Sequence, residues 1–142
     1  MVKVKKPKKR LPPSKSSLVK KLDHEISLYI RLSNSDTNGY VRCVTCSAFK
    51  HWKEMQAGHY ISRSHYSTRW NEDNIFPQCV SCNVFKNGNY PVYAEYLDEK
   101  FGVDYKKKLR LLGAVTVQVS RQWLEEQIKQ YKQLNLKFKH LK

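Results

Sequence analysis

The sequence lacks long apolar runs and is poor in acidic side chains. No apolar stretch approaches the roughly 20 residues that a membrane-spanning helix needs. The first ten residues are basic, but the apolar segment of a secretory signal does not follow them. We therefore expect a cytoplasmic protein. Only 12 residues are Asp or Glu, against 27 Lys or Arg, so the net charge is +15. This balance predicts a polyanionic partner, and nucleic acid fits better than a membrane surface.

Cysteine is also scarce, but its placement is informative. The four cysteines form two C-x-x-C turns, Cys43-Val-Thr-Cys46 and Cys79-Val-Ser-Cys82. Each turn aims two thiolates at one point, so the pair predicts a closed, structural four-cysteine zinc site. Buried free thiols and a redox pair are the alternatives. Neither explains two copies, and a redox pair is expected near a βαβ pattern, which this sequence does not show.

The segment between the two turns is longer than in common zinc ribbons. Thirty-two residues separate Cys46 from Cys79, against about 15–20 in such ribbons. This insertion contains His59. We infer that the zinc is not the chemical centre, and that it clamps both ends of a segment that carries the chemistry.

The chain divides into four regions, which together predict a small α+β protein. Residues 1–17 are mostly basic, Pro or Ser and predict a disordered arm, either a solubilising tail or a phosphate-seeking one. Residues 18–39 predict an N-terminal helix, capped by Ser17, and a turn. Residues 40–90 are predicted to form the core, and residues 91–142 a C-terminal helical region.

Within the core, the pattern predicts a hairpin around the first cysteine pair, then two strands, a loop and a short helix near 80–87. Glycines are expected to end this helix and the next two, over 92–101 and 104–112. A C-terminal helix is expected from Ser120. Its apolar face would consist of Leu124, Ile128, Tyr131 and Leu134.

His59 and Asn83 offer what phosphodiester hydrolysis needs. The reaction requires a base that activates water and a cation that neutralises charge on the phosphate. A neutral imidazole suits the first task near pH 7. Mg²⁺ takes oxygen ligands and keeps much of its water, so one side-chain oxygen such as that of Asn83 can hold it. Asn83 follows Cys82 directly, so the zinc turn would fix its position.

Residues 40–97 resemble the HNH, or ββα-metal, nucleases. The shared pattern is Gly-His at 58–59, Asn74 and C-x-x-C-N at 79–83, with a second C-x-x-C upstream. Within this class the chain is most similar to the NinG (Rap) family of phage recombination proteins, and it also resembles recombination endonuclease VII. The resemblance implies a small ββα-metal (HNH) core stapled by the four-cysteine zinc site and flanked by an N-terminal helix and C-terminal helices.

The resemblance also implies roles for individual residues. His59 stands where the family has its general base, and Asn83 where it has its ligand for a catalytic Mg²⁺ or Mn²⁺. Asn74 matches the Asn that holds the His-bearing strand and loop in register. Arg63 and Arg69 have less direct counterparts, since the family commonly places an Arg near the scissile phosphate.

One position departs from the common pattern. Many HNH enzymes have an Asp or His before the catalytic His as a second metal ligand, and here that position is Gly58. The extracellular DRGH nucleases also have Gly there and use one protein ligand. A second ligand from Glu54, Glu72 or Asp73 is left open.

The function that the resemblance implies is a metal-dependent endonuclease for branched recombination intermediates such as Holliday junctions, working in the host cytoplasm if it is encoded by a phage. Symmetric cutting of a junction needs two active sites, which a homodimer would supply, with the C-terminal helix as candidate interface. Two alternatives stay open. One is a zinc-stabilised DNA-binding module without catalysis. The other is a sequence-specific HNH nuclease, although no recognition module is evident.

Other histidines and aromatic residues are predicted to be structural. Ordinary surface or core roles are expected for His24, His51 and His140, while a phosphate or metal contact is left open for His65. Small-core packing, rather than base stacking, is expected for Tyr40, Trp52, Trp70 and Phe85.

Overall fold

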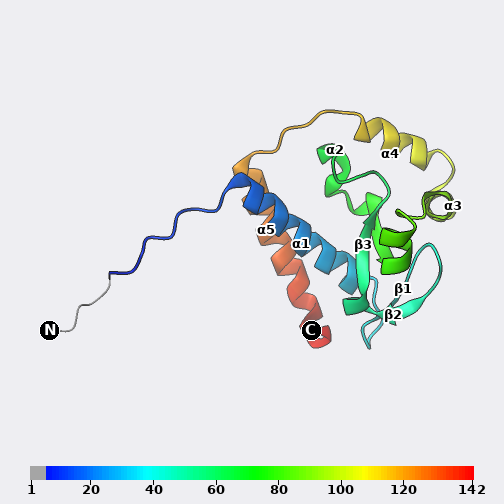
Figure 1. Cartoon of the computed structure of the whole chain (residues 1–142), viewed down its shortest axis with the longest axis horizontal. Helices are drawn as coiled ribbons and strands as arrows, with labels where there is room; N and C mark the ends of the chain where they lie inside the picture. Colours follow the sequence, from blue (N-terminus) through cyan, green and yellow to red (C-terminus); the bar gives the residue numbers. More distant parts are fainter. Residues whose placement is uncertain (1–5) are drawn as a thin grey trace.

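A computed structural model describes residues 6–142, which form helices around two small antiparallel hairpins (Figure 1). The strands are β1 (Tyr40–Arg42), β2 (Phe49–His51), β3 (Met55–His59) and β4 (Ile75–Cys79). The longer helices are α1 (Lys15–Ser33), α3 (Tyr90–Phe101), α4 (Tyr105–Gly113) and α5 (Arg121–Asn135). Short helical segments are η1 (Trp52–Glu54), α2 (Tyr66–Arg69), η2 (Glu72–Asn74), η3 (Ser81–Phe85) and η4 (Leu136–Leu141). The predicted α+β class is therefore confirmed.

The two hairpins lie where the cysteine pattern predicts strands. β1 pairs with β2, with Val41 opposite Lys50, and the first C-x-x-C turn connects them. β3 pairs antiparallel with β4 over five residue pairs, from Met55 opposite Cys79 to His59 opposite Ile75. The chain then enters η3, a single π-helical turn, so the order from β3 onward is strand, loop, strand, helix.

α1 and α5 pack side by side and supply most of the core behind β3 and β4 (Figure 1). The apolar faces of both helices meet in one cluster that includes Leu22, Ile26, Leu124 and Ile128. The predicted apolar face of the C-terminal helix is therefore largely packed within the molecule.

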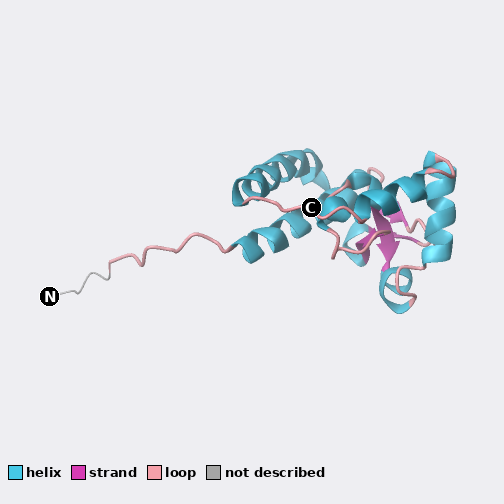
Figure 2. Cartoon of the chain, turned by 90° about the horizontal axis from the view of Figure 1, so that it is seen from above, coloured by secondary structure: helices cyan, strands magenta, loops and turns pink. Residues whose placement is uncertain are grey.

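The start of α1 differs from the prediction. Ser14 caps the helix by accepting a hydrogen bond from the Ser17 amide at 3.1 Å, so Ser17 lies inside the first turn. The reason is local, because two prolines precede Ser14 and prevent the helix from starting earlier. Residues 6–13 have no helix or strand and run away from the body as an exposed arm (Figure 2). The predicted disorder of residues 1–5 lies outside the described residues.

A second core of mostly aromatic side chains supports the other side of the hairpin. Tyr93 of α3 is fully buried, and its hydroxyl donates to the Gly58 carbonyl at 2.7 Å.

Of the aromatic residues predicted to pack in the core, Trp52 is buried and Trp70 is half-buried. The prediction was wrong for Tyr40 and Phe85, which are 42% and 79% exposed. The Tyr40 ring packs instead against Phe49, which is also exposed, on the surface of the first hairpin.

The later helices agree closely with the sequence pattern. α3 ends at Gly102, which has a φ of +90°, as a helix-ending glycine commonly does. Gly113 instead remains inside α4, where a Cβ would press on Ile61. Among the described residues, no helix is long and apolar enough to cross a membrane.

Candidate active site and four-cysteine cluster

The four cysteines converge at the base of the two hairpins. Their sulfur atoms all lie within 4.8 Å of one another, and the Cys46 and Cys79 sulfurs are 3.6 Å apart. A tetrahedral zinc ion with bonds of about 2.3 Å requires sulfur–sulfur edges of about 3.8 Å. The cluster is therefore consistent with structural zinc, as predicted.

The thiols of the cluster differ in proton affinity when no cation is bound. Burial raises the pKa of Cys43, but hydrogen bonds from Thr45 and from backbone amides outweigh it and bring that pKa down to about 6. Burial and the neighbouring thiols raise the pKa of Cys46 to about 12. The four sulfurs therefore do not all ionise together by themselves near neutral pH. A divalent cation supplies the positive charge that four adjacent thiolates need.

A buried relay of polar groups connects this cluster to the hairpin above it. Thr45 contacts the Cys43 sulfur at 3.3 Å and accepts a hydrogen bond from the Gln78 amide at 3.1 Å. The same amide donates to the Gly88 carbonyl at 2.8 Å. The Val44 amide also donates to the Pro77 carbonyl. The position of β4 is thus tied to the first cysteine turn.

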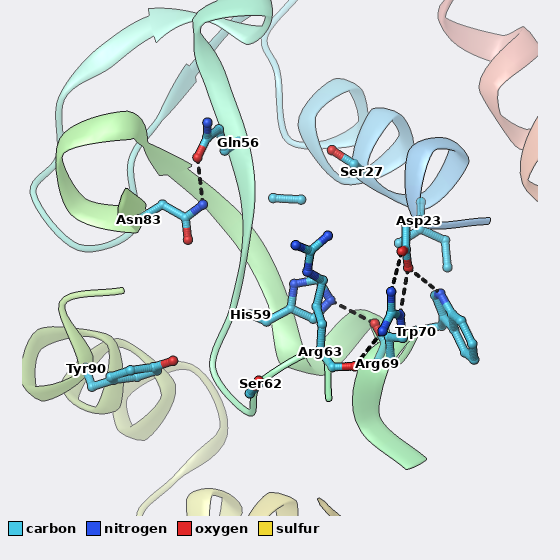
Figure 3. A pocket seen from close by; sticks show the side chains of 12 residues that line it. Asp23, Ser27, Gln56, His59, Ser62, Arg63, Arg69, Trp70, Asn83 and Tyr90 are labelled. Carbon is cyan, nitrogen blue, oxygen red and sulfur yellow. Dashed lines mark hydrogen bonds and ion pairs between the residues drawn. The ribbon is translucent and has the colours of Figure 1, made fainter. Parts of the chain in front are cut away.

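A polar pocket of about 500 Å³ opens on the face of β3 that looks toward α1 (Figure 3). It brings together four of the five predicted catalytic residues, which come from β3, the following loop, α2 and η3: His59, Arg63, Arg69 and Asn83. α1 adds Asp23 and Ser27, and Tyr90 closes another side.

His59 is anchored by one ring nitrogen and leaves the other available. Its Nε2 lies 2.8 Å from the Arg69 carbonyl. A carbonyl oxygen can only accept, so Nε2 carries the proton and Nδ1 of the neutral ring is the basic atom. Burial lowers the pKa of His59, and the nearby Arg63 charge lowers it further, against the opposing effect of the bond to Arg69. The imidazole is therefore neutral near pH 7.

Asn83 lies on η3 and is oriented by a neighbour on β3. Its amide nitrogen donates to Gln56 Oε1 at 2.7 Å (Figure 3). This bond turns the Asn83 oxygen away from Gln56 and into the pocket, where it is a suitable ligand for a hard cation. The sequence indicated Asn83 but gave no reason to select Gln56.

The two arginines have different surroundings. Arg69 makes a two-point pair with Asp23 of α1, at 2.9 and 2.6 Å, and donates to the Arg63 carbonyl at 2.7 Å. Trp70 also donates to Asp23, at 2.9 Å. Arg63 is exposed at the pocket, and within residues 6–142 no carboxylate lies within ion-pair distance of it. Arg63 is thus the cation available to an incoming anion, while Arg69 positions the loop and the His59 ring.

Asn74 is fully buried beneath the pocket instead of lining it. Its side-chain oxygen accepts from the Ile61 amide at 2.7 Å, and its nitrogen donates to the carbonyls of Ile61 and Thr68. These bonds hold the loop after β3 against the end of α2. The contacts match a structural task for this Asn in keeping the His59 strand and its loop in register.

Gly58 faces away from the pocket, against Gln78. A Cβ at this position would overlap the Gln78 side-chain oxygen and come within 2.6 Å of its Cδ. Any larger residue would collide with the relay that leads to the cysteine cluster. A second ligand therefore cannot come from this position in the present backbone.

The three acidic residues considered as alternative ligands do not line the pocket. Glu72 accepts a hydrogen bond from the Tyr131 hydroxyl at 2.7 Å. Asp73 lies beside Tyr105, and burial together with this carboxylate raises the pKa of Tyr105 to about 12. Glu54 is an exposed residue of η1. The carboxylate at the pocket is instead Asp23, which no local sequence pattern indicated because it comes from α1.

The remaining histidine in question has a structural contact. His65 Nδ1 lies 2.9 Å from the Gly113 carbonyl, which joins α2 to α4. It does not line the pocket. One ring nitrogen of His65 is thus engaged in a tertiary contact between helices.

Comparison with known proteins places this architecture in a family. Residues 2–142 match the family described as Bacteriophage Lambda NinG protein. Protein ninG of Salmonella phage P22 is 31% identical over 85 residues, and Protein ninG of Escherichia phage lambda is 32% identical over 84. Each alignment covers 54% of this chain and 41% of the relative, so the matched part spans about two-fifths of those proteins. No solved structure matches.

Proposed function

The chain belongs to the NinG family of lambda-like phage proteins, and we propose that it is a metal-dependent HNH-type DNA endonuclease. Its substrate would be branched recombination intermediates, and its reaction the hydrolysis of a phosphodiester bond by a water molecule that His59 activates. The observation that carries this proposal is the pocket in which His59, Arg63 and Asn83 meet.

Each of these residues is held in a state that suits its task. The Arg69 carbonyl fixes the ring of His59, so its free Nδ1 can take a proton from water. Arg63 offers an unneutralised guanidinium for the phosphate oxygens. The Asn83 oxygen, oriented by Gln56, would hold Mg²⁺ or Mn²⁺ together with substrate oxygens and water. Such an ion would neutralise charge that builds on the phosphate.

The order of the elements supports the relation to the HNH class. His59 ends the first strand of a hairpin, and Asn83 lies on the helical turn that follows the second strand. This is the strand, strand, helix arrangement that the ββα-metal resemblance implies. The cysteine cluster lies below this unit, as the similarity to recombination endonuclease VII leads us to expect.

A cleavage assay tests the proposal directly. Labelled four-way junction, flap and linear duplex are incubated with zinc-loaded protein and Mg²⁺, Mn²⁺ or EDTA. We expect metal-dependent cutting of branched DNA, and a loss of about 10²–10⁴-fold in His59→Ala. His65→Ala is the matched control, because His65 lies outside the pocket. Equal cutting by parent and His59→Ala would refute the assignment of the base.

A non-catalytic, zinc-stabilised DNA-binding module is the second candidate. The observation that favours it is the lack of space for a side chain at Gly58, because Gln78 fills that space. Asn83 is therefore the one oxygen ligand assigned to the metal. Binding of junction DNA without cutting under every metal would support this module. Discrete fragments from linear DNA would instead support a sequence-specific HNH nuclease.

Cutting both strands of a junction would need two copies of the pocket. Because the apolar face of α5 is packed on α1, a homodimer would have to use another surface. Light scattering of the protein with and without junction DNA measures this. A two-to-one complex would support symmetric resolution, and a one-to-one complex would support cutting of a flap or single strand.

A further inference from the structure

A second cavity adjoins the proposed active site. It is lined by Lys15, Ser16, Val19, Lys20, Tyr66 and Arg69. Arg69 also lines the first pocket, so this residue borders both depressions. Together they lead from the beginning of α1 to His59.

One face of α1 forms a wall of both depressions. Residues 16, 19 and 20 line the outer one, and residues 23, 26 and 27 line the inner one. These positions follow the spacing of three and four residues that marks a single stripe on a helix. The two depressions therefore lie one after the other along the same face of α1, and we call this line of two depressions the groove.

The outer half of this groove is positively charged and open to solvent. Lys15 and Lys20 are both exposed, and within residues 6–142 neither lies within ion-pair distance of a carboxylate. The first turn of α1 contains no acidic residue, although a carboxylate there would be favoured by the helix dipole. The exposed arm that precedes it adds Lys6, Lys8, Lys9 and Arg10.

We propose that this groove binds one strand of the DNA substrate and directs its backbone into the active site. Lys15 and Lys20 hold phosphates on one side of the scissile bond, and Arg63 holds the phosphate that is cut. The basic arm that precedes α1 contacts further phosphates beyond Lys15. The inference rests on the proposed function, because it assigns a path to the substrate of that site.

The dimensions of α1 agree with this path. Lys15 and Ser27 are twelve steps apart along α1, which is about 18 Å at 1.5 Å per residue. Phosphates of one DNA strand follow each other at about 3.4 Å along the helix axis. The groove is therefore long enough for more than one phosphate of a strand. The phosphates of a strand in this groove would be contacted by Lys15, Lys20 and the basic residues of the arm.

Two adjacent lysines allow a matched test. Lys20 lines the groove, whereas Lys21, exposed on the same helix, does not. Binding of a labelled junction is measured in EDTA at several salt concentrations for the parent, Lys20→Gln and Lys21→Gln. We expect the slope of log affinity against log salt to weaken by about 0.9 in Lys20→Gln, one phosphate contact, and by about twice that in Lys15→Gln/Lys20→Gln. Lys21→Gln should keep the parent slope.

Single-turnover cleavage separates this proposal from the function on which it rests. Lys15→Gln/Lys20→Gln should need more protein for half-maximal cutting but reach the parental rate at saturation. Equal slopes for Lys20→Gln and Lys21→Gln would overturn the path even if the protein cuts DNA. A parent that binds with the expected lysine dependence but never cuts would retain the path and refute the nuclease.

Discussion

The cysteine cluster lies at one end of the β3–β4 hairpin, the polar pocket extends along β3 to His59 at the other end, and the two have contrasting designs. Three of the four cysteines are buried, and the four sulfur atoms lie within 4.8 Å of one another, which suits four-coordinate binding of one ion. The pocket is open to solvent and combines one imidazole, one unpaired guanidinium and one amide oxygen. A closed set of like donors stabilises a fold, whereas an open set of unlike donors leaves room for substrate. On the proposed function, stability and chemistry are thus assigned to separate sites.

The two regions are nevertheless coupled through few residues. Gln78 connects β4 to Thr45 and, through it, to the Cys43 sulfur. Asn83 directly follows the buried Cys82 in the same helical turn. A disturbance of the cluster should therefore reach the pocket, but a change at the pocket surface should leave the cluster intact. This asymmetry can be tested by substitutions, first in the cysteine cluster and then at the pocket.

The largest effect is expected from breaking the cluster. Cys79→Ser removes one of four thiolates, and structural zinc of this kind commonly supplies about 10–16 kcal/mol of folding free energy. We expect loss of bound zinc, measured by mass spectrometry under native conditions, and loss of the cooperative thermal transition. Ser81→Ala, a change at an exposed residue of the same turn, is the control. An unchanged melting temperature in Cys79→Ser would show that the cluster does not stabilise the fold.

The next effect is expected from the ion pair that joins α1 to the pocket. Asp23 and Arg69 are each only 16% exposed at the side chain, and Trp70 shares the same carboxylate. Asp23→Asn leaves a partly buried guanidinium with weaker acceptors, which should lower the free energy of unfolding by about 2–3 kcal/mol. Chemical denaturation measures this.

Glu125→Gln is the control for that ion pair. It breaks the pair between Arg121 and Glu125, whose side chains are 41% and 52% exposed. Pairs this exposed contribute little to stability, so we expect a change below about 0.5 kcal/mol. Equal losses in Asp23→Asn and Glu125→Gln would show that Asp23 does not hold α1 against the active-site loop.

The parts that the sequence predicted well are those governed by local patterns. The two C-x-x-C turns, the periodicity of α5 and the glycine after α3 each act over a few residues, and all are found as predicted. Asp23 and Gln56 were missed because their importance arises from contacts across 46 and 27 residues of sequence. Arg63 and Arg69 looked alike in the sequence, and only the position of Asp23 distinguishes them. The exposure of Phe85 is likewise a matter of tertiary packing, which its local sequence does not indicate.

A smaller effect is expected at the contact between the relay and the strand. Gly58→Ala forces the Gln78 side chain to move, which should cost about 1–3 kcal/mol of stability, as other overpacked sites do. Gly58→Ala/Gln78→Ala removes the obstacle, although it also removes the bonds to Thr45 and Gly88. We expect the double variant to lose less than the sum of the two single variants. If the losses of unfolding free energy in the two single variants add up in the double variant, the clash between a side chain at position 58 and Gln78 is contradicted.

The smallest effect concerns the proton affinity of His59. Burial holds its pKa below the ordinary value of 6.5. If neutral His59 is the base, single-turnover cleavage should stay constant through neutral pH and fall only below pH 6.5. The same shift affects stability. The unfolded chain takes up a proton at His59 near pH 6.5, whereas the folded chain does not. The stability that comes from neutral His59 is therefore fully present above pH 6.5, and the free energy of unfolding falls as the pH drops below that value.

A substitution of Arg63 should shift the pH at which the cleavage rate falls, while His59 itself is unchanged. The Arg63 charge lowers the pKa of His59, so Arg63→Gln should shift the acidic limb of the cleavage profile to higher pH. The maximal rate should also fall, because the phosphate loses a cation. Lys107→Gln, an equal loss of charge at an exposed residue of α4, should move neither quantity. A slower Arg63→Gln enzyme with an unmoved limb would mean that Arg63 binds phosphate but that the group titrating in the profile is not His59.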